Sequence, residues 1–415
     1  MTSYSPGGSL RTLRLSNAAA VLRTVAEAGP LHRAEIARRV ELSRTTVTTI
    51  TRELIEGGVL VESLDDNRGP EVDGRAGGHL MLTPTAAWAG GVNMTLDGVA
   101  ARVHDLAGGE LGTAQRELAP TDDGERRAEL ATEALDEALE RAGGHRDRLL
   151  AVGVGLPGQI DPSEGVVHGA LDDQPWHGVN ALDVMSNRLG VPVLVENNVR
   201  LETLAECRWG DARDVENLIY VHISSGLAIG IVIAGQLYRG ADGGAGEFGH
   251  VSIDIEGPAC RCGNRGCLVL KAGGSAVGRL LRDVLGDSAK LSDIVAASAA
   301  GNRAVRNVLR DVGGVVGREL ASICNLLNPE LVVVGGQTAS AGDVLLEPLR
   351  EGLVRHTLAP RGAPKVVPSL LPAGADAGAW GAIALVLASV HSSPTALERL
   401  LELGAASVER RVRSS

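Results

Sequence analysis

Aromatic side chains are scarce in this chain, which has one Phe, three Tyr and four Trp among 415 residues. Apolar residues still make up 44% of the sequence, so the interior must be built from Val, Leu, Ile and Ala. That composition suits buried parallel strands covered by helices. At roughly 100–200 residues per domain, the length predicts two or three domains.

Long hydrophobic runs are missing as well. The longest run, around Ala379 to Val390, is well short of the ~20 residues that span a bilayer. The first residues, MTSYSPGGSLRTLRLSN, lack the apolar segment of a signal peptide. We therefore expect a cytoplasmic protein with no membrane partner. Cysteines stay reduced in that compartment, where clustered ones bind metal more often than they form disulfides.

Basic residues are a minority overall, since the net charge is −11. They gather near the N-terminus: residues 10–56 contain eight Arg and five Glu, a local charge of +3 that leaves −14 for the rest of the chain. This asymmetry predicts a small domain with an anionic partner, attached to an acidic body.

The basic segment, residues 17–61, has the pattern of three short helices followed by a strand. Ser16 and Asn17 are good N-caps for the first helix, and Gly29-Pro30 ends it. A second helix is expected over residues 33–40, with Ile36, Ala37 and Val40 facing inward.

The third helix carries the features of a DNA reader. Ser43 is its N-cap, and Val47, Ile50 and Leu54 form one buried stripe at helical spacing. Short hydroxyl-bearing and basic side chains lie on the opposite face, as on the recognition helix of a helix-turn-helix. The residues of this helix predicted to contact DNA are Ser43, Arg44, Thr45, Thr46, Thr48, Thr49 and Arg52.

Two strands are expected next, in GVLVES and GGHLMLTP, around a Gly-rich loop with Arg68 and Arg75. Such a hairpin is a plausible wing, and Arg75 is predicted to contact phosphate or the minor groove. The alternative is a small helical docking domain whose arginines are merely solvated. The local basic excess, the polar helix face and the wing together favour DNA binding.

Beyond Thr85, apolar strands alternate with helical stretches, an α/β pattern. The segments AGGVNMTLDGVAARVHDLAGGEL and LIYVHISSGLAIGIVIAGQLYRG share one plan of strand, turn and strand, which predicts a duplicated lobe. The expected organisation is a DNA-binding domain over residues 10–84, a two-lobed body over 85–392, and a polar helix and tail over 393–415.

Three of the five cysteines lie in the stretch CRCGNRGC. His250, Cys260, Cys262 and Cys267 together make a Cys3His set, which fills a tetrahedral zinc shell and leaves no vacancy for water. Gly263 and Gly266 permit the tight loop that this needs. The alternative is a Gly-rich loop of reduced cysteines, but so compact a spacing favours one structural zinc per chain.

The sequence resembles the ROK family, whose name stands for repressors, open reading frames and sugar kinases. The resemblance rests on GADGGAGEFGH with CRCGNRGC, and on GVGLPGQIDP, LVENN and NPELVVVGG. It implies an actin-like, two-lobed sugar-kinase fold that binds zinc through the positions matching His250 and the three cysteines, with a sugar between the lobes. The winged helix-turn-helix is typical of the family's regulators and is absent from its kinases.

The phosphoryl-transfer parts depart from the kinase pattern. The first phosphate loop, Asp-x-Gly-Gly-Thr in the kinases, is matched by NMTLD from Asn93 to Asp97, which has no glycine to bring backbone N–H groups to a phosphate. The second loop, SSGLAIG, keeps Gly226 and Gly230 with bulkier residues between them. The general base at the end of Glu-Asn-Asp is Asn198, and an amide cannot accept the proton. We therefore expect no catalytic residues and no enzyme activity.

The effector site is predicted at Asn197, Asn198, Glu247 and His250, which offer donors and acceptors suited to sugar hydroxyls. A nearby family glutamate, in Cys-Leu-Glu, is Val269 here, so a different, larger or phosphorylated ligand is possible. In the alternative interpretation, Glu247 and Asn198 only satisfy buried loop backbone.

The sequence thus predicts a transcription regulator, a repressor, that binds a double-stranded DNA operator as a homodimer or a dimer of dimers and responds to a sugar or sugar derivative. The alternative is a sugar kinase with an added DNA-binding domain.

Overall fold

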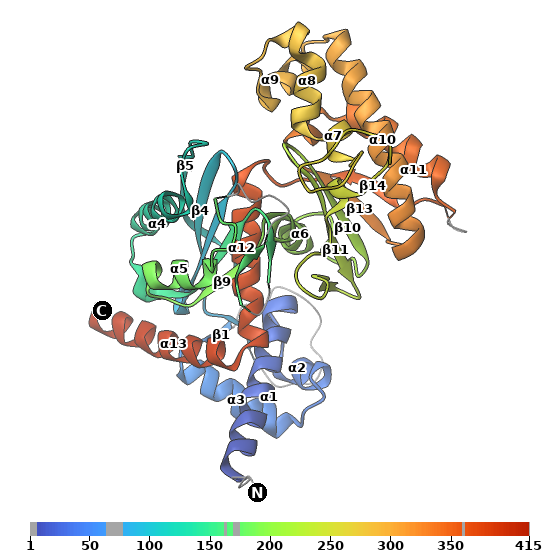
Figure 1. Cartoon of the computed structure of the whole chain (residues 1–415). Coiled ribbons are helices and arrows are strands. Elements are labelled where there is room, and N and C mark those ends of the chain that lie inside the picture. Colours follow the sequence, from blue (N-terminus) through green and yellow to red (C-terminus); the bar gives the residue numbers. More distant parts are fainter. Residues whose placement is uncertain (1–5, 64–77, 162–163, 169–174, 359–361, 415) are drawn as a thin grey trace, which may run out of the picture.

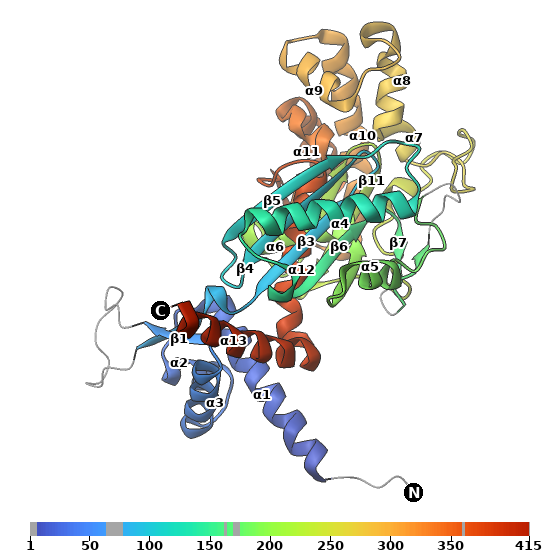
Figure 2. The ribbon, with the colours of Figure 1, turned by 90° about the vertical axis from the view of Figure 1, so that its left-hand side faces the viewer.

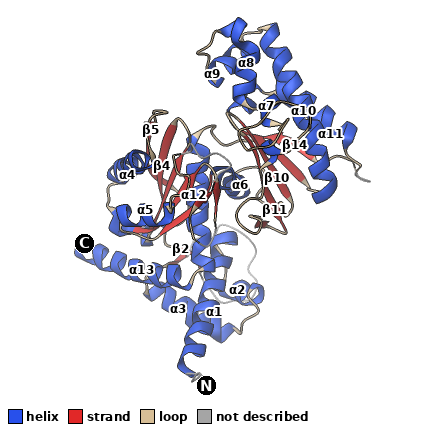
Figure 3. Ribbon diagram, in the orientation of Figure 1, coloured by secondary structure: helices blue, strands red, loops and turns tan. Residues whose placement is uncertain are grey.

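The computed structural model describes residues 6–63, 78–161, 164–168, 175–358 and 362–414. The chain forms a small helical unit at the N-terminus and a body of two α/β lobes (Figure 1). In Figure 3 each lobe is a sheet with helices packed against it. The predicted class, a winged helix-turn-helix followed by an actin-like two-lobed body, is confirmed.

The N-terminal unit contains three helices and a two-stranded antiparallel sheet: α1 (Pro6–Ala28), α2 (Arg33–Arg39), α3 (Arg44–Glu56), β1 (Leu60–Ser63) and β2 (His79–Leu82). The predicted start of the first helix is wrong, because α1 begins at Pro6 and runs through Ser16 and Asn17. Proline is tolerated in a first helical turn, and Leu15 packs on the hydrophobic core, which continues the helix upstream.

The two lobes have the same strand order, which confirms the predicted duplication. In each sheet the chain makes an antiparallel meander and then adds two parallel strands, so that the order is third, second, first, fourth, fifth. The strands of the first lobe are β3 (Trp88–Met94), β4 (Gly98–Asp105), β5 (Glu110–Glu117), β6 (Leu149–Leu156) and β9 (Val193–Asn197). The strands of the second lobe are β10 (Leu218–Ile223), β11 (Leu227–Ile233), β12 (Gln236–Leu237), β13 (Leu331–Gly335) and β14 (Lys365–Pro368). The short hairpin β7 (Gln159–Ile160) and β8 (Val167–His168) follows β6.

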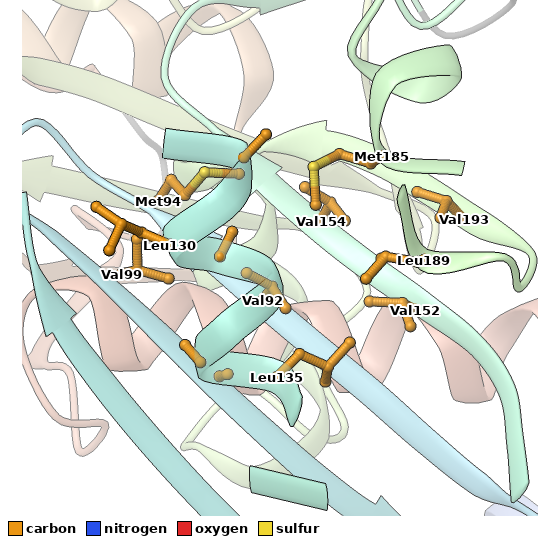
Figure 4. Packing of buried hydrophobic residues seen from close by; sticks show 14 of the residues in the cluster. Val92, Met94, Val99, Leu130, Leu135, Val152, Val154, Met185, Leu189 and Val193 are labelled. Atoms are coloured by element: carbon orange, nitrogen blue, oxygen red, sulfur yellow. The ribbon is translucent and has the colours of Figure 1, made fainter. Parts of the chain in front are cut away.

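Helices cover both sheets. In the first lobe α4 (Gly124–Arg141) lies across one face (Figure 2), with α5 (Ala181–Leu189) beside it, and α12 (Ala375–Ser392) covers the other. Figure 4 shows the core between α4 and the sheet, where Leu135 of α4 packs with Val92 of β3 and Val152 of β6. The second lobe carries α7 (Val269–Ala272), α8 (Gly274–Leu285), α9 (Leu291–Ala299), α10 (Arg303–Leu327) and α11 (Asp343–His356). Single 3-10 turns are η1 (Pro84–Ala86), η2 (Arg146–Arg148), η3 (Phe248–His250) and η4 (Gln337–Ala341).

One helix, α6 (Asn198–Trp209), lies between the lobes (Figure 1) and contacts α12 on one side and β10 and β11 on the other. Its backbone touches α12 directly: a Cβ on Gly381 would lie 1.8 Å from the carbonyl oxygen of Leu201. Only glycine fits such a contact. Helices α6 and α12 are therefore packed as one unit.

The last helix, α13 (Pro394–Ser414), shares a hydrophobic core with the N-terminal unit. Leu397 and Leu400 are buried in the same cluster as Leu22 of α1, Leu54 of α3 and Ile383 of α12. The expected polar tail is thus a helix with one strongly apolar side, and the N-terminal unit is built onto the first lobe through α12 and α13.

No single helix among the described residues has the length and apolar composition to cross a membrane. Only the bent pair Ala375–Val390 and Thr395–Arg410 passes such a test, jointly and across a 93° break.

Candidate metal centre and effector site

The four predicted metal ligands converge. One ligand atom from each of His250, Cys260, Cys262 and Cys267 lies within 4.8 Å of the others. Cys260 Sγ is 3.6 Å from His250 Nδ1, and Cys262 Sγ is 3.6 Å from Cys267 Sγ. Sulfurs bound to one tetrahedral Zn²⁺ at ~2.3 Å are about 3.8 Å apart, so the donor set and its spacing fit a closed metal shell. The cluster can hold a metal ion.

The loop that carries these ligands closes on itself. Ser252 pairs with Cys267 and Ala259 with Arg265 in isolated bridges. Gly266 has a positive φ of 56°, and a Cβ there would lie 1.8 Å from Asp254 O. Burial opposes ionisation of Cys260, but hydrogen bonds from Cys262 and His250 outweigh it and lower the pKa of this thiol. Burial and the two other cysteines raise the pKa of Cys267 to about 12, so Cys260 ionises before Cys267 in the metal-free cluster.

The two asparagines at the start of α6 have different environments. The side chain of Asn197 is occupied: its Oδ1 accepts from Val199 N at 2.9 Å, and its Nδ2 donates to Gly158 O at 2.8 Å. It is the N-cap of α6. Asn198 Nδ2 donates to Met94 O at 2.9 Å, while its buried Oδ1 has no partner. A buried acceptor without a donor is costly, so Asn198 is the amide available to a ligand or water.

Glu247 lies on the second-lobe loop that leads to His250. Burial raises the pKa of its carboxyl, against the opposing charges of His250 and Arg200 and a hydrogen bond from Gln159. Gln159 belongs to β7 of the first lobe. Glu247 therefore joins residues of both lobes.

Sequence reasoning missed the side chains that hold this loop in place. Glu196 accepts from Arg200 Nη1 at 2.9 Å through one oxygen and from Arg239 Nε at 2.5 Å through the other. Arg200 also donates to the carbonyls of Gly243 and Ala245, the latter at 3.4 Å. These contacts bind α6 to the loop before Glu247. The sequence signal available was Glu196 and Arg200 at i, i+4 spacing, the separation of an ion pair along a helix.

The segment that matches the first phosphate loop is packed and hydrogen-bonded within the body. Asn93 is fully buried, donates to Ala375 O at 2.9 Å, and fits between two glycines: a Cβ on Gly155 would lie 2.1 Å from its Oδ1, and one on Gly378 2.3 Å from its Cγ. In the following turn Thr95 N donates to Gly98 O at 2.8 Å.

The second loop is a tight turn between β10 and β11, with Ser224 N donating to Gly226 O at 2.9 Å. Leu227 and Ile229 point into the hydrophobic core of the second lobe. The retained Gly230 has a packing reason, because a Cβ there would lie 1.8 Å from Thr203 Oγ1.

The predicted DNA-reading helix forms as expected. Ser43 caps α3 by accepting from Thr46 N at 3.0 Å, and Val47, Ile50 and Leu54 are buried. The opposite face is exposed at Arg44, Thr45, Thr48, Thr49 and Arg52, while Thr46 is half-buried beside the cap. Thr48 Oγ1 donates to Arg44 O at 2.8 Å.

The wing is partly described. Its strands β1 and β2 are paired, and Arg33 of α2 makes a two-pronged ion pair with Glu62 of β1 at 2.6 and 3.0 Å. Residues 64–77, which include Arg68 and Arg75, lie outside the described residues.

Comparison with known proteins identifies both parts. The family model "ROK family" matches residues 90–389, and the model "Winged helix-turn-helix DNA-binding" matches residues 19–61. The chain belongs to the ROK family. Among curated ROK relatives it is similar to the xylose repressor of Caldicellulosiruptor bescii, with 28% identity over 83% of this chain and 88% of that protein. It is also similar to the DNA-binding transcriptional dual regulator NagC of Escherichia coli K12, with 29% identity over 82% and 84%.

Solved ROK structures agree on the fold. A ROK family transcriptional regulator, a homologue of the E. coli MLC protein, superposes with a TM-score of 0.79 over 94% of this chain and 99% of its own, at 24% identity. A ROK family glucokinase from Streptomyces griseus, in complex with glucose and AMPPNP, superposes with a TM-score of 0.64 over 72% and 99%, at 27% identity. The regulator match extends over the winged helix as well as the body.

Proposed function

We propose that this ROK protein is a transcription regulator, a repressor, that binds operator DNA through α3 and releases it in response to a carbohydrate. The observation that carries the proposal is the exposed basic and hydroxyl-bearing face of a capped recognition helix, fused to a ROK body. The named relatives are a xylose repressor and NagC. Operator binding places the protein in the cytoplasm.

The proposed effector contacts are Asn198, Glu247 and His250. Asn198 supports this assignment with an unpartnered buried oxygen, and Glu247 joins residues of both lobes. Asn197 is already occupied as a helix cap, so its part in the site is to position Asn198. A sugar held by both lobes would favour one lobe arrangement over another, and only such differential binding can switch the protein.

The metal is proposed to be one structural Zn²⁺ per chain. A Cys3His shell is closed to water and lends no Lewis-acid chemistry; it supplies folding energy instead. His250, Cys260, Cys262 and Cys267 would hold it, fixing the end of the loop on which Glu247 lies.

The DNA-bound form is proposed to be a homodimer or a dimer of dimers. Two recognition helices about one helical turn of DNA apart read a palindromic operator. A ligand that changes the lobe or subunit arrangement would then change the half-site spacing.

The experiment is footprinting of the protein on the DNA upstream of its own gene, followed by a screen of sugars for release. Xylose and N-acetylglucosamine are the first candidates, because the similar proteins include a xylose repressor and an N-acetylglucosamine repressor of Escherichia coli O6:H1. A protected palindrome that one sugar releases supports the proposal. Binding that no sugar, sugar phosphate or amino sugar alters would reject carbohydrate control.

A sugar kinase is the competing function, favoured by the similarity to the S. griseus glucokinase. Asn93 is enclosed by glycines, the turn at Thr95 is closed by its own hydrogen bond, and Leu227 and Ile229 after the second turn pack into the hydrophobic core. Phosphoryl transfer depends mainly on positioning and neutralising the nucleotide phosphates. We therefore expect no sugar-dependent ADP release, and none from Asn198→Asp alone. ADP release from a hexose by the unmodified protein, lost on Glu247→Ala, would establish the kinase instead.

A further inference from the structure

Helix α6 presents a buried polar face to the second lobe. Arg200, Glu202, Thr203 and Glu206 are all at most 3% exposed, which is unusual for four polar residues on one short helix. Arg200 reaches the loop before Glu247, as described above. The other three residues face the sheet of the second lobe and the segment after β14.

Glu202 makes the central contact. One of its oxygens is 2.7 Å from Nδ1 of His222, which lies on β10. The hydroxyl of Tyr220, two residues earlier on the same strand, also donates to Glu202. One turn further along α6, Glu206 accepts from Ser369, which follows β14. The carboxylates therefore come from the helix packed on the first lobe, and their donors come from the second.

This arrangement makes the lobe contact depend on charge. A buried carboxylate is tolerated only when it is paired and hydrogen-bonded. Glu202 meets this condition only while the second lobe stays against α6. If the imidazole of His222 loses its proton, the ionic attraction between the two side chains is lost, and Glu202 is left buried without a cationic partner.

We propose that the Glu202–His222 pair is a proton-sensitive latch between the lobes, closed when the imidazole is charged and released when it is neutral. The proposal rests on the function given above, because the relative placement of the lobes is what a bound effector would alter. The latch therefore makes the sugar concentration that releases the operator depend on pH. It adds a second input to the effector site, from which it is separate.

The neighbouring ionisable groups agree with this direction. Burial lowers the pKa of His222, but the charge and hydrogen bond of Glu202 outweigh it, so that the net pKa is raised. In the described part of the chain, Glu206 of α6 and Tyr220 of β10 also interact with Glu202, and burial raises the pKa of each, which favours its neutral form. A raised pKa means that the latch is fully closed below about 6.5, the pKa of a free imidazole, and is lost as the pH rises through the raised value.

The test is hydrogen exchange of the full-length protein between pH 5.5 and 8.5, corrected for the intrinsic rate, with α6 and β10 as the reporting segments. In the unmodified protein the opening constant of these segments should rise with pH by up to about tenfold per unit, the slope of one linked proton. In Glu202→Gln and His222→Gln the constant should be higher at pH 5.5 and independent of pH. Either variant alone suffices if the other fails to fold.

Glu137→Gln is the matched control. It breaks the ion pair of Glu137 with Arg116, which lies within the first lobe, and should leave the pH profile of α6 and β10 unchanged. A flat profile in the unmodified protein, or one that Glu202→Gln does not alter, overturns the latch.

The same samples are then titrated on operator DNA at both ends of the pH range, with xylose and, separately, N-acetylglucosamine as the releasing sugar. The sugar concentration needed for half release should depend on pH in the unmodified protein only. A pH-dependent exchange profile with a constant release concentration overturns the regulatory role. Hydrogen exchange needs neither DNA nor sugar, so the exchange test of the Glu202–His222 pair remains valid even if the protein is not a regulator.

Discussion

At the scale of single residues, the cysteine cluster gives the sharpest prediction. Cys262→Ser, or chelation of the metal, should destabilise the body strongly, because a structural zinc contributes about 10–16 kcal/mol of apparent binding energy to folding. Metal analysis should find one zinc per chain in the unmodified protein and thermal unfolding should start at a lower temperature in the variant. Cys207→Ser is the control, since Cys207 lies outside the cluster. An intact, equally stable protein with clearly less than one zinc per chain would refute the assignment.

Glu247 carries the second prediction at this scale. Glu247→Ala should abolish sugar binding and leave operator affinity near normal, because the residue lies on the second lobe, away from α3. Isothermal titration with the releasing sugar measures the first effect, and a footprint measures the second. Glu256→Ala removes an exposed carboxylate from the neighbouring loop and should change neither. Undiminished sugar affinity in Glu247→Ala would remove this residue from the site.

At the scale of elements, α3 is predicted to read DNA with a division of roles. Arg44→Ala should weaken operator binding, whereas Thr48→Ala should change base preference with a smaller loss, about 1–3 kcal/mol of discrimination at one position. The hydroxyl of Thr48 donates to Arg44 O within the helix. Rotation of the side chain would exchange this hydrogen bond for one to a base. Binding to a library of operator variants separates the two effects, with Arg310→Ala on α10 as control. If both variants bind like the parent, another element reads the DNA.

The elements that the sequence predicted well are those fixed by local contacts. The stripe of Val47, Ile50 and Leu54 and the cap at Ser43 depend on neighbours within one helix, so spacing alone reveals them. The metal loop is equally local, with all its cysteines within eight residues. The start of α1 was missed because the burial of Leu15 depends on contacts with distant elements.

The surroundings of the proposed effector residues could be predicted only in part, for the same reason. The predicted sugar-binding roles of Glu247 and Asn198 follow from the family resemblance. The resemblance does not identify the contacts that hold these two side chains in place. Arg200 meets Gly243 across 43 residues of sequence, and no periodicity encodes that contact. The sequence analysis also missed that Asn197 is the N-cap of α6. Asn197 belongs to the motif LVENN, which was interpreted as part of the effector site and not as a helix start.

At the scale of the whole molecule, the N-terminal unit and the first lobe share one core and should unfold together. Leu400 of α13 is fully buried in that core, so Leu400→Ala should cost about 2–5 kcal/mol and lower operator affinity. Val408→Ala, at a position 39% exposed on the same helix, should cost far less. Urea unfolding followed by signals from each part measures this. Two separate transitions, with only one shifted by Leu400→Ala, would show that the units are independent.

We infer that a ROK body with altered phosphate loops serves as a sugar-responsive switch for a DNA-binding helix. One titration tests it directly: fluorescence anisotropy of labelled operator DNA with the protein, ATP and each sugar of a panel, with ADP assayed in the same samples. We predict tight operator binding that one sugar releases, with no ADP above the protein-free control. Sugar-dependent ADP formation, with operator DNA bound no more tightly than a random duplex, would show that the protein is a sugar kinase and not a regulator.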